Sequence, residues 1–389
     1  MTRLILRRGH DRRVRGGHPW VFSNEIDALD GPAEIGSAVA VTAADGQLLG
    51  TAYYNPRSLI AARLLSRTAE SIDTTPFFVA QLQRALAFRQ RLCGDLDALR
   101  LVHGEADGLP GLIVDRYGAV LSIQLLTAGM EARRAAVIAA LVEVFSPQAI
   151  VARNDSASRE LEGLPRAVEL LYGELPADIP VDINGISFGV DVSGGQKTGL
   201  FLDQRQNCRL LDGLVAGGEV LDLFCYAGAW SLHAARYGAA AVTGVDVSAG
   251  AVALARSNAG RNSLEERCSF VAADVFDFLR QQRGRRYDVV ILDPPAFIKS
   301  RKHLEEGLKG YLTVNRRALE MVAPGGVLVT CSCSHHLERE RFVALLAQAA
   351  RQADRSVRLA ALTGAGADHP VLPACPETDY LKCALLYVE

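Results

Sequence analysis

Two short segments in the C-terminal half combine residue types that can do covalent chemistry. Asp293 follows a predicted strand at Tyr287–Leu292, and Cys333 follows the next predicted strand, at Gly326–Cys331. In open α/β sheets, ligands bind at the carboxyl ends of such strands. A thiolate can add to C6 of a pyrimidine and turn C5 into a carbon nucleophile. We therefore predict Cys333 as a nucleophile and Asp293 as the carboxylate that holds the base edge.

The residues after Asp293 are suited to the mouth of a pocket. Pro294 and Pro295 keep the backbone rigid, and Phe297 offers a ring for stacking on a base. We include all three as substrate-binding candidates. The alternative is a rigid turn without function. The other cysteines near predicted strand ends are interpreted as small buried residues; they are Cys208, Cys225 and Cys331.

Three acids follow three successive predicted strands: Asp222, Asp246 and Asp274 end or follow Glu219–Leu223, Ala241–Asp246 and Cys268–Ala272. The first turn lacks the glycine pattern by which backbone approaches a pyrophosphate, which argues against a dinucleotide. S-adenosylmethionine instead carries an ammonium, a ribose and an adenine, for which Asp222, Asp246 and Asp274 are the respective partners we expect. Each acid alone is also explained as a helix N-cap. The neighbouring cofactor candidates are Phe224, Tyr226, Ala227, Gly228, Val247 and Val275.

The elements that must position these residues alternate from about Asp191 onward. The predicted helices between the strands are Ala229–Tyr237, Ala249–Asn262, Phe276–Gln282 and Leu304–Val322. Alternating strands and helices predict an α/β fold with a Rossmann-type, doubly wound parallel sheet over residues 191–389.

The N-terminal half has a different pattern. Strands at Ala38–Thr42, Leu48–Tyr54 and Leu59–Leu65 predict a small β-barrel over residues 1–72. A linker over residues 73–97 contains a helix from Thr75 to about Cys93. Residues 98–190 mix strands with a helix at Glu131–Phe145 and predict a central α+β domain.

Composition and charge limit the class of protein. The 389 residues hold no apolar run long enough for a membrane helix or a signal peptide, so we expect a cytoplasmic protein. The eight cysteines show no spacing suited to zinc, so we expect no metal. The net charge is −2, but residues 1–20 hold six arginines against one acid. Arg12 and Arg13 are therefore candidates for contacting RNA phosphates, with a solvated arm as the alternative.

The motifs together resemble the bacterial large-subunit ribosomal RNA cytosine-5 methyltransferases of the RlmI type, over the whole chain. The matching stretches are Arg8–Phe22, His103–Asp115, Gln196–Gln204, Asp222–Gly228, Asp293–Phe297, Ser332–Ser334, and His369-Pro370 followed by Tyr380-Leu381-Lys382.

The resemblance implies a PUA RNA-binding barrel, a central domain, and a methyltransferase domain acting on 23S ribosomal RNA with S-adenosylmethionine. It assigns the nucleophile to Cys333 and makes Lys197, Thr198 and Phe201 cofactor-binding candidates. Many other RNA cytosine-5 methyltransferases carry a cysteine where this chain has Ala296. The base that removes the C5 proton is therefore open between a water molecule and Asp293.

Other functions stay open at this point. An RNA guanine N-methyltransferase would use the Asp-Pro-Pro motif without needing a cysteine. A dinucleotide-dependent oxidoreductase is disfavoured by the missing glycines, and an RNA-assembly factor would bind the cofactor without turnover. The oligomeric state is open as well, with a homodimer as the commonest arrangement among soluble enzymes.

Overall fold

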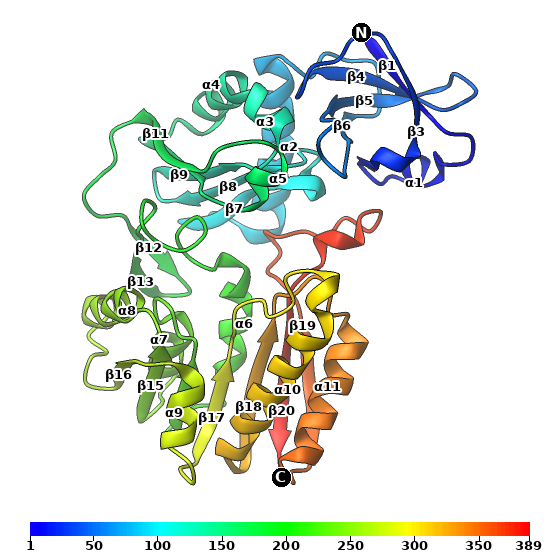
Figure 1. Ribbon diagram of the computed structural model, residues 1–389. Coiled ribbons are helices and arrows are strands. Elements are labelled where there is room, and N and C mark those ends of the chain that lie inside the picture. The colour runs from blue at the N-terminus through cyan, green and yellow to red at the C-terminus, as the bar shows by residue number, and fades with distance from the viewer. The chain divides into compact units, whose positions relative to one another are not determined.

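The computed structural model describes residues 1–389 and consists of two compact units (Figure 1). The first unit comprises residues 1–181, 190–202 and 367–378. The second comprises residues 182–189, 203–366 and 379–389. Each unit is interrupted in sequence, so both contain segments from the C-terminal half. The domain boundaries at 72, 97 and 190 stay a prediction.

The second unit is built on a seven-stranded sheet in the order β16-β15-β14-β17-β18-β20-β19. Its strands are β14 (Glu219–Leu223), β15 (Ala241–Asp246), β16 (Cys268–Ala272), β17 (Tyr287–Leu292), β18 (Val322–Ser332), β19 (Val357–Thr363) and β20 (Lys382–Val388). Strands β16 to β18 are parallel neighbours, which confirms the doubly wound α/β class. Strand β20 was not predicted, and it is antiparallel to both β18 and β19. Antiparallel neighbours need no helical crossover, and the connection from β19 to β20 contains no α-helix, only the short 3-10 helix Pro376–Thr378.

Helices cover both faces of this sheet, because a right-handed crossover places each one on the face that its strands dictate. They are α6 (Arg205–Cys208), α7 (Ala229–Arg236), α8 (Ala249–Arg261), α9 (Val275–Gln281), α10 (Leu304–Met321) and α11 (Arg339–Gln352). Figure 1 shows α9, α10 and α11 in front of the strands. The unpredicted α11 buries Phe342, Leu345, Leu346 and Ala349, a helical spacing that the sequence already contains.

The N-terminal part of the first unit is a six-stranded sheet in the order β2-β6-β5-β4-β1-β3. Its elements are β1 (Thr2–Leu6), α1 (Arg12–Arg15), β2 (Trp20–Val21), β3 (Ile26–Asp30), β4 (Ala38–Thr42), β5 (Leu48–Tyr54) and β6 (Ala62–Ser66). The predicted strand Leu59–Leu65 begins too early, since Leu59 lies in a turn and is 71% exposed. Strands β1 to β3 were not predicted; in β1, Leu4 and Leu6 are fully buried, and Ile5 between them is only partly buried.

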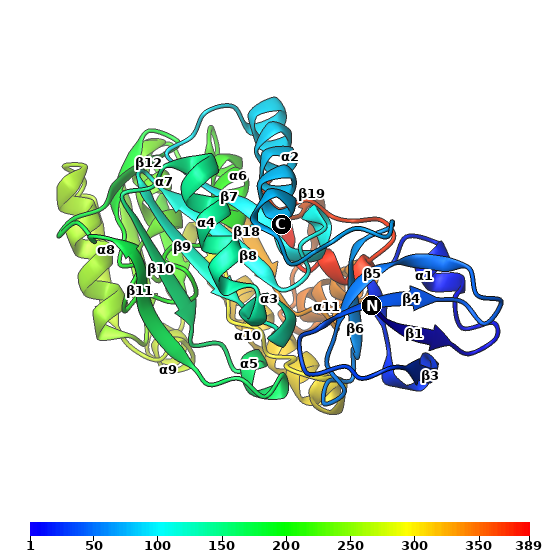
Figure 2. The same cartoon turned by 90° about the horizontal axis from the view of Figure 1, so that it is seen from above.

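The remaining part of the first unit contains a five-stranded sheet in the order β11-β10-β9-β8-β7. A separate pair, β12 and β13, begins at the end of the first unit's residues 1–181 and lies mostly in the second unit. The strands are β7 (Ala98–His103), β8 (Leu112–Tyr117), β9 (Val120–Leu125), β10 (Ala149–Asn154), β11 (Ala167–Gly173), β12 (Pro180–Ile183) and β13 (Ile186–Gly189). The helices are α2 (Thr75–Cys93), α3 (Ala128–Ala132), α4 (Arg134–Phe145) and α5 (Ser158–Leu161). Helices α2 and α4 pack against one another (Figure 2).

The helix predicted at Glu131–Phe145 is confirmed over α4, but its predicted start is wrong, because the chain breaks between α3 and α4. Arg133 leaves helical geometry at the break, with φ −103° and ψ 11°. Its buried guanidinium donates to the carbonyls of Gly36 (2.8 Å), Ile72 (3.1 Å) and Gly129 (2.7 Å). Satisfying a buried cation outweighs the continuity of one helical turn. No helix of the chain has the length and apolar composition needed to cross a membrane.

Candidate active site

The turn after β14 holds an unusual backbone conformation. Phe224, Tyr226 and Gly228 have φ values of +66°, +46° and +81°. Left-handed geometry at a residue other than glycine costs about 1–3 kcal/mol and persists only where neighbours enforce it. Here the backbone N–H of Cys225 donates to Val245 (3.0 Å), and that of Tyr226 donates to the Asp246 carboxylate (2.9 Å). Adjacent strand β15 therefore shapes the turn that carries four of the cofactor candidates, Phe224, Tyr226, Ala227 and Gly228.

Asp222 lies beneath this turn and is completely buried. One carboxylate oxygen accepts from the backbone N–H (3.0 Å) and hydroxyl (2.6 Å) of Ser231, while the other, Oδ1, has no hydrogen-bond partner. Burial raises the pKa of Asp222 to about 7; the Ser231 hydrogen bonds act against this rise, and the nearby Asp293 charge contributes to it. An unsatisfied buried carboxylate oxygen favours a cation nearby, as in the amino-acid end of S-adenosylmethionine. Because protein covers Asp222, a direct contact with an ammonium stays a prediction.

Asp246, at the end of β15, is fixed through both oxygens. Oδ2 accepts from Tyr226 N–H (2.9 Å) and Oδ1 from Ser248 N–H (2.9 Å). Each carboxylate oxygen has a second lone pair, so a diol can still be bound. The next residue, Val247, is 71% exposed and offers apolar surface beside the carboxylate. The acceptor oxygens of Asp246 and the apolar surface of Val247 together fit a ribose that carries an aromatic base.

Asp274 is a helix N-cap, which the sequence analysis gave as the alternative to cofactor binding. Its Oδ1 accepts from Asp277 N–H (3.0 Å) and caps α9. Val275, the first residue of α9, is buried. A capping carboxylate that is also exposed can bind a ligand through its second oxygen. The adenine contact of Asp274 stays a prediction.

Asp293 is positioned by two residues that sequence reasoning missed. The Gln204 amide (3.0 Å) and the Trp230 indole N–H (3.2 Å) both donate to its Oδ2. Gln204 precedes α6 and Trp230 lies in the first turn of α7, so two separate elements fix one carboxylate. The sequence held only a weak signal for these two contacts: an amide and an indole N–H in buried segments each need a hydrogen-bond acceptor.

The loop after Asp293 packs closely on α10. The Phe297 ring lies 4.7 Å from the Tyr311 ring, and a side chain at Gly307 would come within 2.8 Å of the Phe297 carbonyl. Pro294 is buried and Pro295 is exposed. Glycine in α10 thus lets the helix approach the loop, and the loop is held in place by packing. Stacking of Phe297 on a base stays a prediction.

Cys333 differs from the other cysteines near strand ends. Its side chain is partly exposed, and its Sγ lies 4.0 Å from the Pro294 carbonyl, so the two segments with reactive residues are in contact. Burial raises the pKa of Cys208, Cys225 and Cys331 far above the ordinary thiol value. These three thiols are therefore inert, as the sequence interpretation expected.

The remaining candidates belong to the first unit. Thr198 is buried and bonds the Asp115 carboxylate, whereas the Lys197 ammonium lies 4.5 Å from the centre of the Phe201 ring. Their cofactor role stays a prediction. Arg12 is exposed on α1, whereas Arg13 makes two 2.9 Å contacts with Glu25 and also lies over the Phe22 ring. Arg12 is consequently the better placed of the two for an external phosphate.

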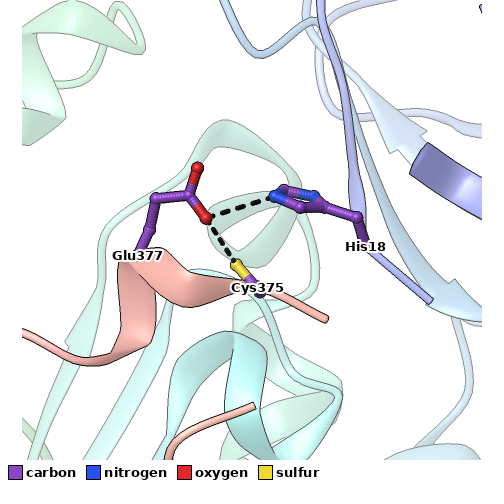
Figure 3. A group of neighbouring side chains, drawn as sticks. All are labelled: His18, Cys375 and Glu377. Atoms are coloured by element: carbon purple, nitrogen blue, oxygen red, sulfur yellow. Dashed lines mark hydrogen bonds and ion pairs between the residues drawn. The ribbon is translucent and has the colours of Figure 1, made fainter. Parts of the chain in front are cut away.

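His18, Cys375 and Glu377 form the group with the closest resemblance to a metal site (Figure 3). His18 Nδ1 accepts from Trp20 N–H (3.1 Å), so a neutral ring carries its proton on Nε2 and donates it to Glu377 (3.2 Å). Burial lowers the pKa of His18, which keeps the ring neutral. The Cys375 thiol also donates to Glu377 (3.4 Å), and burial raises its pKa. Two donors on one carboxylate make this a hydrogen-bond cluster.

Comparison with known proteins places this geometry in a family. The PUA-like domain family matches residues 4–67, and the S-adenosylmethionine-dependent methyltransferase family matches residues 148–375, more than half of the chain. A curated relative from Shewanella denitrificans, "Ribosomal RNA large subunit methyltransferase I", is 41% identical over 387 residues, covering 98% of both chains.

Solved structures agree with the fold. A Streptococcus mutans protein described as a candidate SAM-dependent methyltransferase superposes with a TM-score of 0.85 at 25% identity, covering 100% of both chains. A second structure, of a candidate methyltransferase complexed with SAH, gives 0.85 at 24% identity, again over 100% of both chains. On the sheet, the strand-end residues and these matches, the chain belongs to the S-adenosylmethionine-dependent methyltransferases of the ribosomal RNA large subunit methyltransferase I family.

Proposed function

We propose that this protein converts a cytosine of 23S ribosomal RNA into 5-methylcytosine through a covalent adduct on Cys333. The observation that carries the proposal is the contact between the Cys333 thiol and the Asp293-Pro294 segment, at the same sheet edge as the cofactor turn. The name of the curated relative supports ribosomal RNA as the substrate, and the PUA-like match supports RNA binding.

Asp293 orients the base in this mechanism. Gln204 and Trp230 hold its Oδ2, so the carboxylate keeps one direction while the cytosine enters. A carboxylate accepts well from the exocyclic amino group of cytosine, which a uracil lacks. The target base must leave its stack to reach this depth. Arg12 and its neighbours contact phosphates and position the RNA without specifying sequence.

Cys333 supplies the electrons for the reaction. Its thiolate forms an Sγ–C6 bond, and the C5–C6 π electrons become available at C5. Bound S-adenosylmethionine would supply an electrophilic methyl group for C5, with S-adenosylhomocysteine as the leaving group. After C5 loses its proton to a base, either water or Asp293, the Sγ–C6 bond breaks and the thiolate is regenerated. No oxidant or reductant is needed.

The test is methylation of ribosomal RNA taken from cells that lack this gene, read by bisulfite mapping and nucleoside mass spectrometry. Wild-type protein should form 5-methylcytosine. Cys333→Ala should form none while binding S-adenosylhomocysteine as before, and Cys331→Ala, changed at the buried neighbour, should retain activity. Full activity in Cys333→Ala would sink the adduct mechanism.

Other products would identify the alternatives. Methylguanosine formed without Cys333 would indicate an N-methyltransferase. Cofactor binding without turnover on any ribosomal RNA would indicate an assembly factor. A homodimer and a cytoplasmic location stay predictions.

A further inference from the structure

Lys382 is a buried lysine that the proposed mechanism does not use. It begins β20 and is only 2% exposed. Its ammonium donates to the backbone carbonyls of Ser334 and Tyr380, both at 2.7 Å. Lysines are rarely buried without a specific reason, since the charge must be compensated. Two neutral carbonyls orient the ammonium but carry no negative charge.

Lys382 interacts with the residues on both sides of Cys333. In the antiparallel pairing of β18 with β20, Lys382 stands opposite Ser332, and its ammonium bonds the carbonyl of Ser334. Cys333 is the residue between these two. Its backbone is further anchored because the Ser334 hydroxyl contacts the Tyr311 hydroxyl (2.9 Å) and accepts from Ile298 N–H (3.2 Å). The thiol and the ammonium are thus held in one small, rigid part of the fold.

Lys382 interacts electrostatically with Cys333, and the other titratable groups nearby include His335, whose ring lies 5.4 Å from the Tyr380 ring. Arg339 donates to Asp379 through two guanidinium nitrogens (3.0 and 3.1 Å), so the effects of these two residues on Lys382 oppose each other. Tyr311 of α10 is neutral, because burial raises its pKa. Asp293, which precedes Pro294, is the opposing negative charge, and Gln204 and Trp230 donate to it.

The titration of Lys382 is consistent with this arrangement. Burial lowers the pKa of Lys382 to about 8, and the charge of an ionised Cys333 acts against this lowering. The two groups therefore stabilise each other's charged forms. A nearby lysine is one of the established causes of a depressed thiol pKa.

We propose that Lys382 is the positioning residue that activates Cys333: its ammonium, held by the Ser334 and Tyr380 carbonyls, stabilises the Cys333 thiolate. This inference rests on the proposed function, in which that thiolate adds to C6. The thiol proton leaves to water, Lys382 keeps its three protons, and the same field receives the thiolate when the Sγ–C6 bond breaks. Lys382 itself forms no bond to the substrate.

The experiment measures alkylation of Cys333 by iodoacetamide against pH in the full-length protein, followed peptide by peptide with mass spectrometry. It needs no RNA, so its result is independent of whether the chain makes 5-methylcytosine. The partly exposed Cys93 serves as the reference thiol in every sample. The variants are Lys382→Met, Lys382→Arg and the matched control Lys309→Met, which removes an exposed lysine from α10.

In wild-type protein, Cys333 should be half ionised below the ordinary thiol pKa of about 8.5. Lys382→Met should move that midpoint up by about one pH unit, which lowers the alkylation rate at pH 7 roughly tenfold. Lys382→Arg should keep a low midpoint and Lys309→Met should not change it. With RNA substrate, Lys382→Met should move the acidic limb of kcat to higher pH while S-adenosylhomocysteine binding is retained.

Two results would overturn the proposal. One is a wild-type Cys333 midpoint at or above 8.5, a measurement that requires no variant and so decides the matter even if Lys382→Met does not fold. The other is an unchanged profile in a folded Lys382→Met protein. Neither result would bear on the adduct itself, which Cys333→Ala tests.

Discussion

The two halves of the sheet edge hold their functional groups in different ways. At β14, β15 and β16, the carboxylates are fixed largely by nearby backbone amides: Asp246 by Tyr226 and Ser248, and Asp274 by Asp277. At β17 and β18, side chains distant in sequence make the contacts: Gln204 and Trp230 donate to Asp293, and Lys382 donates to the carbonyl of Ser334, which follows Cys333. We call these the cofactor half and the acceptor half.

This difference has a physical consequence. A group held by backbone amides of its own turn or of the adjacent turn keeps its place as long as those turns are folded. A group held by distant side chains depends on several elements being in register at once, so single substitutions there can change chemistry without unfolding the cofactor half. Variants in the two halves should therefore separate catalysis from cofactor binding.

The largest effect is expected in the acceptor half. Asp293→Ala should lower kcat by about 10²–10³-fold, as removal of a single preorganised polar group in an active site commonly does. Affinity for S-adenosylhomocysteine, measured by calorimetry, should stay within about twofold. Glu306→Gln, at an exposed acid of α10, is the control. A loss of affinity as large as the loss of kcat would show that the two halves do not act separately.

The next effect tests the cofactor half. Asp246→Ala leaves two backbone N–H groups without their acceptor and removes the predicted ribose ligand. We expect S-adenosylhomocysteine to bind about 10–100-fold more weakly, or roughly 1.4–2.8 kcal/mol. At saturating S-adenosylmethionine, kcat should recover to within a few fold. Unchanged affinity would remove Asp246 from the cofactor site.

A smaller effect, of opposite sign, concerns the buried Asp222. Its pKa is raised from 3.8 to about 7, so the folded protein retains a proton that the unfolded chain loses. Stability from this group is complete below about pH 4 and is lost as pH rises through 7. Asp222→Asn should therefore stabilise the protein above pH 7, by about 1–2 kcal/mol.

The pKa shift of Asp222 sets the upper limit on the stabilisation by Asp222→Asn. A shift of about three pKa units corresponds to about 4 kcal/mol, and the gain is smaller because the polar Asn side chain must still be buried. Urea unfolding at pH 4 and pH 8 measures it: the gain should be absent at pH 4. A gain that does not change with pH would contradict the account. S-adenosylhomocysteine affinity should fall in the same variant if Asp222 attracts the ammonium.

The smallest effect separates two roles of Asp274. Asp274→Ala removes the cap of α9 and should cost about 1 kcal/mol of stability, whereas Asp274→Ser retains a capping oxygen and should cost little. Equal loss of S-adenosylhomocysteine affinity in both variants would support the adenine contact. Unchanged affinity in Asp274→Ser would leave the residue as a cap alone.

The same division explains what could be predicted. Strands β14, β15, β16 and β17 have the predicted bounds, because each is a short apolar run ended by a turn. The break at Arg133 and the strand β20 were not predicted. Both depend on partners distant in sequence, namely the carbonyls that Arg133 binds and the two strands between which β20 lies.

The amino-acid sequence by itself determined the alternation of strands and helices, the acids at successive strand ends, and the choice of Cys333 over its neighbours, since hydrophobic spacing and motif order are local properties. Only the tertiary structure decided that Asp222 is covered by protein, that Gln204 and Trp230 hold Asp293, and that Lys382 bonds the carbonyl of Ser334. These contacts arise from strand order and register, which bring together residues tens of positions apart and are set by packing of the whole sheet.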